Sequence, residues 1–308
     1  MGRIRPARAN GYPAGLTPFE LSLVLTSALF HAWWNVAIKG SGDPLCFNAL
    51  QEVAPLAALL CVAPFVHFGQ IPAPVWRLLA AAGVAHALYF YWMSRAYEHG
   101  DLSLVYPIAR STPALLPLIA VPLFGELLSL GGALGIAIVV AGIWLVHGGT
   151  GLRLSALAAP AARFAYLTLA TTVAYSLLDK AAMGELAAAP WTSPVPRPVL
   201  YCLLLSAANG VIFVPLVLRA RGARALAAAA RIHGARATVA TTVSFASYSL
   251  ILWALETAPV SYVVAVRQTS VLFAVVMGIV MLRERPGRGR IVGAAATVLG
   301  VALIARFS

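Results

Sequence analysis

Charged side chains are scarce in this sequence. Asp, Glu, Lys and Arg make up only 10% of the 308 residues, whereas 61% are hydrophobic and the mean hydropathy is +0.86. Soluble domains carry roughly 25% charged residues. A water-soluble globule of this length could not cover so much apolar surface. The composition therefore excludes that class and predicts an all-α integral membrane protein with lipid as its solvent.

Several motifs are also missing. The phosphate-binding pattern Gly-x-x-x-x-Gly-Lys-Ser/Thr does not occur, so ATP is not expected as a direct energy source. The six histidines are scattered along the chain, which argues against an intramembrane enzyme. Cys46, Cys61 and Cys202 lie in apolar segments without ligand spacing and are expected to pack rather than to bind metal or form disulfides. We predict no cofactor and no metal site.

Long apolar stretches dominate what is present. A membrane-spanning helix needs about 20 apolar residues, and ten such stretches leave no room for a soluble catalytic domain. They cover residues 17–38, 45–67, 75–97, 102–124, 129–147, 164–183, 199–218, 238–256, 260–282 and 290–306.

The net charge of +12 does not indicate a nucleic-acid partner, because most arginines lie in short loops between the predicted spans. Such arginines set membrane topology and contact lipid headgroups. Arg3, Arg5 and Arg8 precede the first apolar run without a clear cleavage site, which predicts an uncleaved first helix. We therefore expect a multi-pass protein of the inner cell membrane, with the lipid bilayer and a small-molecule substrate as partners.

The sequence also repeats itself. A shift of 158 residues, the separation of Glu98 and Glu256, aligns a long stretch with itself without a gap. The other aligned pairs include Ser103 with Ser261, Val105 with Val263, Thr112 with Ser270, Glu126 with Glu284, Gly135 with Gly293 and Gly142 with Gly300. We predict two five-helix repeats, residues 17–147 and 164–306. Because five is odd, the second copy enters the membrane from the opposite side, and such inverted repeats open a midplane site to each face in turn. One chain suffices for this symmetry, so a monomer and a homodimer are both compatible with it.

These features resemble the drug/metabolite transporter superfamily in its EamA-type branch. The resemblance rests on the repeat, on the Pro-rich fourth span from Tyr106-Pro107 to Pro117, and on the Gly125-Glu126 step followed by Gly135 and Gly142. Arg283 departs from the pattern, which has glycine there. The segment from His31 to Asn35, with Lys39, is similar to a bacterial subgroup associated with phosphonate use. The resemblance implies a secondary transporter with both termini in the cytoplasm.

Each repeat places one arginine well inside a predicted span. Arg110 lies in the fourth span and Arg267 in the ninth, and Gln268 aligns with Arg110. Ionisable groups at membrane depth cost about 2.5–3.5 kcal/mol on insertion scales and are functional candidates for that reason. A guanidinium binds carboxylate or phosphate through paired hydrogen bonds. We predict that these three residues bind an anionic substrate; the alternative is internal pairing of the arginines with Glu52 or a helix carbonyl.

Further substrate contacts are expected from polar and aromatic side chains. His31, Trp34 and Asn35 share one helix face that is poorly suited to lipid and should turn inward. The remaining candidates have aromatic rings with polar tips, which suit either a cavity wall or an interfacial belt. They are Tyr89, Tyr175 and Tyr248.

Three groups could carry a coupling ion. Glu52 is the clearest carboxylate within a predicted span, and Asp179 lies in the sixth span beside Lys180. His31 could relay a proton or be a neutral, hydrogen-bonded histidine.

The function predicted from these residues is alternating-access transport of a small organic anion such as a phosphonate or a carboxylate. An exporter of amino acids or of drug-like neutral or cationic compounds is the alternative, and a channel or a scaffold fits less well. The orientation stays open. The loops after the seventh and ninth spans are the richest in arginine, which opposes the cytoplasmic termini that the resemblance implies.

Overall fold

A computed structural model describes residues 15–39, 41–99, 102–148, 157, 162–282 and 287–308. These residues form helices and turns, with no strand among them. The α-helices are α1 (Pro18–Lys39), α2 (Pro44–Leu50), α3 (Val53–Val62), α4 (Ala73–His99), α5 (Leu102–Ala109), α6 (Thr112–Phe124), α7 (Leu130–Gly148), α9 (Ala162–Ala188), α10 (Arg197–Arg221), α11 (Ala223–Leu255), α12 (Val260–Arg267), α13 (Ser270–Leu282) and α14 (Arg288–Phe307). Two short 3-10 helices, η1 (Ala63–Phe65) and η2 (Phe68–Gln70), connect α3 to α4.

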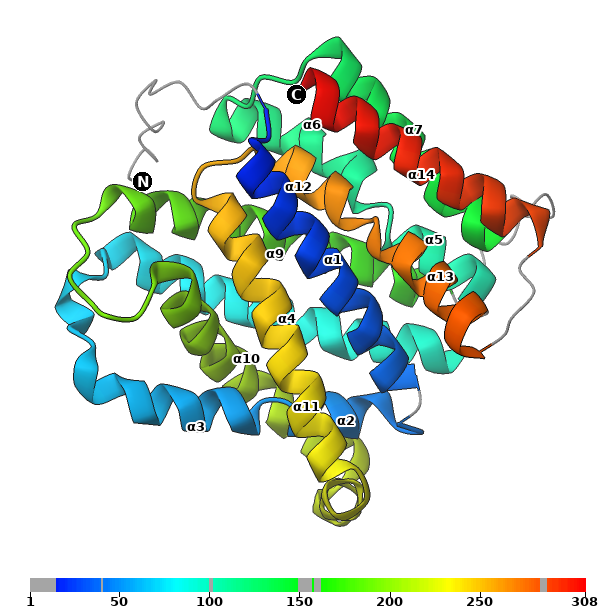
Figure 1. Cartoon of the computed structure of the whole chain (residues 1–308). Helices are drawn as coiled ribbons and strands as arrows, with labels where there is room; N and C mark the ends of the chain where they lie inside the picture. The colour runs from blue at the N-terminus through cyan, green and yellow to red at the C-terminus, as the bar shows by residue number, and fades with distance from the viewer. Residues whose placement is uncertain (1–14, 40, 100–101, 149–156, 158–161, 283–286) are drawn as a thin grey trace.

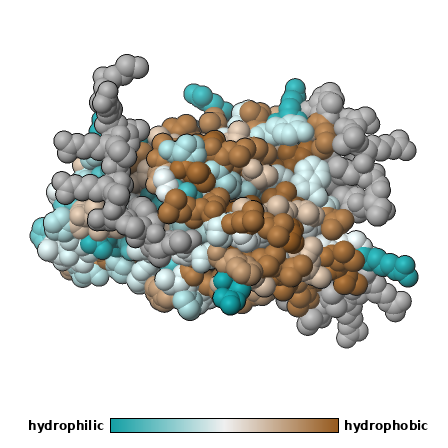
Figure 2. Space-filling model, turned by 90° about the horizontal axis from the view of Figure 1, so that it is seen from above, coloured by the Kyte–Doolittle hydropathy of each residue, from teal (hydrophilic) through white to brown (hydrophobic). Residues whose placement is uncertain are grey.

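The ten predicted spans correspond to ten helical segments, three of which are broken (Figure 1). Among the described residues, six segments are long and apolar enough to cross a membrane, and Leu130–Val146 is a shorter apolar helix. The remaining three segments are α1, α4 and α9. Figure 2 shows apolar residues gathered over one face of the molecule, as a lipid-facing surface requires.

Two of the three breaks have a proline as their cause. Proline lacks an N–H, and its ring clashes with the carbonyl four residues earlier. Pro55 thus frees the Gln51 carbonyl between α2 and α3, and this oxygen accepts a hydrogen bond from Thr241 Oγ1 at 3.3 Å. Pro113 has the same effect just after Arg110, where α5 ends and α6 begins.

The third break, between α12 and α13, contains no proline. The Gln268 and Thr269 amides bond carbonyls three residues back instead of four, and Thr269 Oγ1 also donates to the Val266 carbonyl at 2.8 Å. Side chains that compete for backbone carbonyls in this way loosen a helix. The breaks in the fourth and ninth segments therefore fall at Arg110 and at Gln268, which are aligned positions.

Glycines allow the closest helix contact in the bundle. On α7 and α14, a Cβ at Gly135 would lie 2.7 Å from the Gly300 carbonyl oxygen, and one at Gly300 would lie 2.6 Å from that of Gly135. Gly142 and Gly293 face each other in the same manner. The two backbones can approach this closely because none of these residues has a Cβ. Elsewhere α4 packs along α9, and α1 packs along α11.

The contacts define two ends of the bundle. At the termini end, the Leu16 amide donates to Ser308 Oγ at 3.2 Å, and Lys180 Nζ donates to the Leu255 and Ala258 carbonyls at 2.9 and 2.8 Å. At the opposite end, Arg221 binds Asp43 and Glu98, which joins the end of α10 to the α1–α2 turn and the end of α4. We call this second end, which contains Arg221, Asp43 and Glu98, the arginine end.

Two segments between the predicted spans are helical. After Gly222, the basic segment 219–237 is continuous with the eighth span, because its alanine run favours helix. The sixth span is also longer than predicted, since α9 continues to Ala188. Some residues named above lie outside the described part of the chain. They are the three arginines of the amino-terminal arm, Arg283 and Glu284, and the side chain of Lys39.

Candidate functional site

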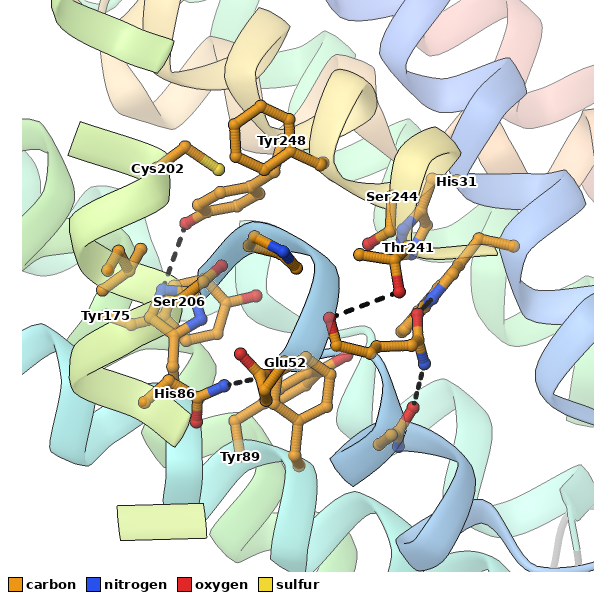
Figure 3. A pocket seen from close by; sticks show the side chains of 18 of the residues that line it. His31, Glu52, His86, Tyr89, Tyr175, Cys202, Ser206, Thr241, Ser244 and Tyr248 are labelled. Atoms are coloured by element: carbon orange, nitrogen blue, oxygen red, sulfur yellow. Dashed lines mark hydrogen bonds between the residues drawn. The ribbon is translucent and has the colours of Figure 1, made fainter. Parts of the chain in front are cut away.

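The larger polar cavity lies between the two halves of the bundle. It has a volume of about 100 Å³. Figure 3 shows His31, Glu52, His86, Tyr89 and Tyr248 around it, contributed by α1, the α2–α3 break, α4 and α11. Segments far apart in the sequence thus meet at one site.

A smaller cavity of about 40 Å³ adjoins the first. His31, Tyr89, Tyr175 and Arg267 line both cavities, so they form the wall between them. Among the predicted site residues, Arg110 and Gln268 line only the smaller cavity, whereas Trp34, Glu52 and Tyr248 line only the larger one.

The two arginines have no acidic partner among the described residues. Arg110 Nη2 lies 2.9 Å from His31 Nε2, and its guanidinium carbon lies 5.2 Å from the centre of the Tyr106 ring. The Arg267 guanidinium carbon is 5.2 Å from the centre of the Tyr248 ring. Two guanidinium groups therefore line one small cavity, held by aromatic rings and a histidine.

Unused hydrogen-bonding groups surround the same place. Arg267 Nε, Gln268 Oε1 and Thr112 Oγ1 are buried, belong to residues that line the smaller cavity, and have no hydrogen-bond partner among the described residues. Buried polar groups without partners are costly, and the native ones call for an explanation. A ligand that fills this cavity would supply the missing partners.

Glu52 does not pair with either arginine. Its Oε1 accepts a hydrogen bond from Asn209 Nδ2 at 2.8 Å, and it lines the larger cavity at the break in the second span. The alternative of an Arg–Glu52 pair is thus not seen among the described contacts. The carboxylate faces the cavity beside Tyr89 in Figure 3.

Asp179 is fully buried, and the structure places it behind the cavity wall. Its carboxylate is bound by His86 Nε2 at 3.0 Å, by the Tyr201 hydroxyl at 2.7 Å and by the Tyr248 hydroxyl. His86 lines the larger cavity and stacks on Tyr175, with ring centres 4.1 Å apart. Asp179 therefore reaches the cavity only through His86 and Tyr248.

Sequence reasoning missed His86, although a signal existed. His86, Tyr89, Phe90 and Met93 follow the spacing of one helix face, and that face turns into the two cavities. Tyr201 and Asn209 were also missed. Their roles depend on contacts with distant segments, which helical spacing does not reveal.

The residues predicted on the polar face of α1 have different surroundings. Trp34 Nε1 donates to Gln51 Oε1 at 2.7 Å, and its ring stacks on His31 with centres 5.1 Å apart. Asn35 is a different case, because its Nδ2 donates to the His31 carbonyl at 2.8 Å and it lines neither cavity.

The apolar helices and the polar cavities between them together define a multi-pass membrane protein with a polar interior. The chain belongs to the EamA-like transporter family, which matches residues 18–148 and 193–306. Proteins of this family are membrane transporters of small molecules, and the expected membership is confirmed. This membership also supports the expectation that the chain is not an enzyme.

The fold is shared with a solved structure known only as "Crystal structure of protein". The TM-score is 0.68 at 17% sequence identity, over 93% of this chain and 98% of that chain. An identity this low supports the fold alone. The search of the curated proteins gave no match.

Proposed function

We propose that this chain is a secondary transporter of a small organic anion, such as a phosphonate or a carboxylate, in the inner cell membrane. The observation that carries the proposal is the pair Arg110 and Arg267, which line one small cavity without an acidic partner among the described residues. A guanidinium stays charged when buried and binds oxyanions through a planar fork of donors. An anionic ligand would compensate both charges.

The two cavities suit two parts of one molecule. The anionic group would lie in the smaller cavity, where Gln268 and Thr112 add polar atoms without partners. The organic part would lie in the larger cavity against the aromatic side chains of Trp34, Tyr89 and Tyr248. His31 and Tyr175 stand at the boundary, since both line each cavity.

Alternating access between two inverted repeats is the mechanism that we propose. In the repeat alignment α9 corresponds to α1, and α11 corresponds to α4. The packing of α4 on α9 therefore has its image in the packing of α11 on α1, while α7 and α14, the last helices of the repeats, pack on each other. This pairing of contacts supports a site between two equivalent halves.

A coupling proton would act through Glu52. An ionised carboxylate in the larger cavity repels an anionic group in the adjoining smaller one, so binding of the anion is favoured when Glu52 carries a proton. Proton and anion would then cross together. His31 and Asp179 are the other coupling candidates; Asp179 already has three hydrogen-bond partners.

A second candidate function is export of amino acids or of drug-like neutral or cationic compounds. The same Glu52 favours it, since a carboxylate in an aromatic cavity also suits a cationic group. Glu52 thus distinguishes the two candidates by the charge of the ligand that depends on it.

A thermal-shift screen of the purified protein tests the proposal. Anionic, zwitterionic and cationic metabolites would be compared on the wild type, on Arg267→Gln, and on Arg306→Gln as a matched control that removes an exposed arginine outside both cavities. A ligand at a hundredfold excess over its Kd adds about 2.7 kcal/mol of stability. We expect anions to stabilise the wild type and Arg306→Gln but not Arg267→Gln. Stabilisation of all three proteins by cations alone would favour the second candidate.

A further inference from the structure

The arginines of the described chain gather at one end of the bundle. On α10 and α11 the exposed ones are Arg219, Arg224, Arg231 and Arg236. Contacts fix where this segment lies, because Arg236 Nη2 donates to the Ala37 carbonyl, near the end of α1, at 2.9 Å. The start of α11 therefore lies beside the α1–α2 turn, and Figure 1 shows it projecting from the bundle on the side away from the chain termini.

Other helices add arginines to the same end. Arg163, at the start of α9, is exposed, and its guanidinium carbon lies 4.7 Å from the Phe164 ring, which Arg95 of α4 also approaches at 5.9 Å. Exposed Arg288 and Arg290 begin α14, whose other extremity, Ser308, contacts Leu16 at the termini end. Since α14 runs from one end to the other, its first residues belong to the arginine end.

The described carboxylates are distributed in the opposite way. At the arginine end, Asp43 and Glu98 are both bound by Arg221, so they neutralise few of the arginines around them. At the termini end the described arginines are Arg77, Arg197 and Arg306.

The carboxylates of the termini end largely balance these arginines. Glu20 bonds Thr257, Glu126 bonds the Val260 and Ser261 amides, and Glu185 and Glu256 also lie there. Among the described residues, the two ends thus differ strongly in charge.

The start of α11 is a basic extension of the eighth span. Leu226 and Ala229 pack against the buried cluster that includes Phe213 and Val217 of α10, whereas Arg224 and Arg231 are exposed. Arg224 and Arg231 are seven residues apart and share one helix face. Ile232 is 74% exposed beside them, which suits the boundary between headgroups and acyl chains better than water.

We propose that the arginine end is a docking surface for anionic phospholipid headgroups of the cytoplasmic leaflet, and that both chain termini lie on the other side of the membrane. Short loops rich in arginine stay on the cytoplasmic side during insertion, and anionic lipids of that leaflet attract basic segments next to a span. This orientation is opposite to the one that the family resemblance implies. It does not depend on the substrate, so the transport proposal can fail without affecting it.

Labelling of single cysteines tests the orientation. Arg306→Cys marks the termini end and Arg231→Cys the arginine end, each in a Cys61→Ser background; Cys46 and Cys202 are buried. Spheroplasts would receive a membrane-impermeant maleimide before and after permeabilisation. We expect Arg306→Cys to react at once and Arg231→Cys only after permeabilisation. Reaction of Arg231→Cys in sealed spheroplasts, alone or together with Arg306→Cys, would overturn the assignment.

Reconstitution tests the lipid contact separately. The unfolding temperature would be compared in phosphatidylcholine vesicles and in vesicles that contain phosphatidylglycerol. The variants are Arg224→Gln/Arg231→Gln and the matched control Arg77→Gln/Arg306→Gln, which removes two exposed arginines of the termini end. We expect phosphatidylglycerol to raise the unfolding temperature of the wild type and the control, and to raise that of the arginine-end variant less. Equal shifts in all three proteins would contradict the docking surface.

Discussion

Arg110 Nη2 lies 2.9 Å from His31 Nε2, and this contact fixes the state of the histidine. A guanidinium can only donate hydrogen bonds, so Nε2 must accept and His31 is neutral with its proton on Nδ1. The alternative in which His31 carries a relayed proton would break the contact. In this conformation His31 therefore orients Arg110.

The first prediction follows from that role. His31→Phe removes the acceptor, whereas His31→Gln can offer an amide oxygen to Arg110. A hydrogen bond to a charged group contributes about 1.5–3 kcal/mol, so His31→Phe should weaken anion binding about tenfold or more. Titration of the purified proteins with the anion found in the screen measures this, and His31→Gln should retain most of the affinity. Equal losses in both variants would contradict an orienting role.

The sequence alone was enough to predict that both arginines lie at similar depth in the bundle. The repeat alignment placed Arg110 and Arg267 at similar depth in equivalent spans, and both line the smaller cavity. It did not predict the helix breaks beside them. Pro113 could have indicated the first break, but the second depends on how Thr269 and its neighbours bond the backbone, which no sequence pattern specified.

The sequence could not predict which residues of distant helices form hydrogen bonds with each buried charged group. Asp179 and Lys180 are neighbours in the chain, yet their side chains bind different parts of the structure. Asp179 binds His86 and Tyr201, whereas Lys180 caps carbonyls of the α11–α12 turn. Which partner each group finds depends on the tertiary arrangement of α4, α10 and α11. Helical spacing cannot reveal that arrangement.

The α7–α14 contact gives a second prediction. Gly135→Ala would place a Cβ 2.7 Å from the Gly300 carbonyl oxygen, a backbone atom that cannot move aside alone. Such overpacking costs about 1–3 kcal/mol of folding free energy. Gly234→Ala is the matched control, because nothing lies within 4 Å of its Cβ and alanine favours helix. Thermal unfolding in detergent should show a clear loss for Gly135→Ala and none for Gly234→Ala; similar melting of both would remove the packing argument.

Lys180 supports a third prediction. Its Nζ donates to the Leu255 and Ala258 carbonyls in the α11–α12 turn, where the helix ladder ends and leaves carbonyls without helical donors. Lys180→Met should destabilise the protein by about 1–3 kcal/mol, since buried carbonyls lose their donor. Glu185→Gln, an exposed change on the same helix, is the control and should leave the unfolding temperature unchanged. Unchanged stability of Lys180→Met would show that the carbonyls find other donors.

Asp43 provides a fourth prediction, on pH dependence. Burial alone would raise the pKa of its carboxyl group, but hydrogen bonds from Cys46 and Arg221 outweigh burial and hold the pKa below its ordinary value. A lowered pKa in the folded state means that the stabilisation is complete above the unfolded value of about 3.9. It is lost as the pH falls through the folded value. The pair is partly exposed, so the effect should stay below about 1 kcal/mol. Unfolding temperatures of wild type and Asp43→Asn, measured from pH 7 to pH 3, should converge at the acidic end.

Glu52 gives the prediction that separates the two candidate functions. Glutamine at this position keeps the Oε1 that accepts from Asn209 and resembles the protonated acid in charge. If a proton on Glu52 accompanies the anion, wild-type binding should strengthen as the pH falls, whereas Glu52→Gln should bind the anion equally well across the range. Transport by the variant should then no longer respond to an imposed pH gradient, although exchange of anion for anion continues. If instead Glu52→Gln abolishes binding of cationic compounds and leaves anions unaffected, the carboxylate holds a positively charged substrate and the exporter function is the correct one.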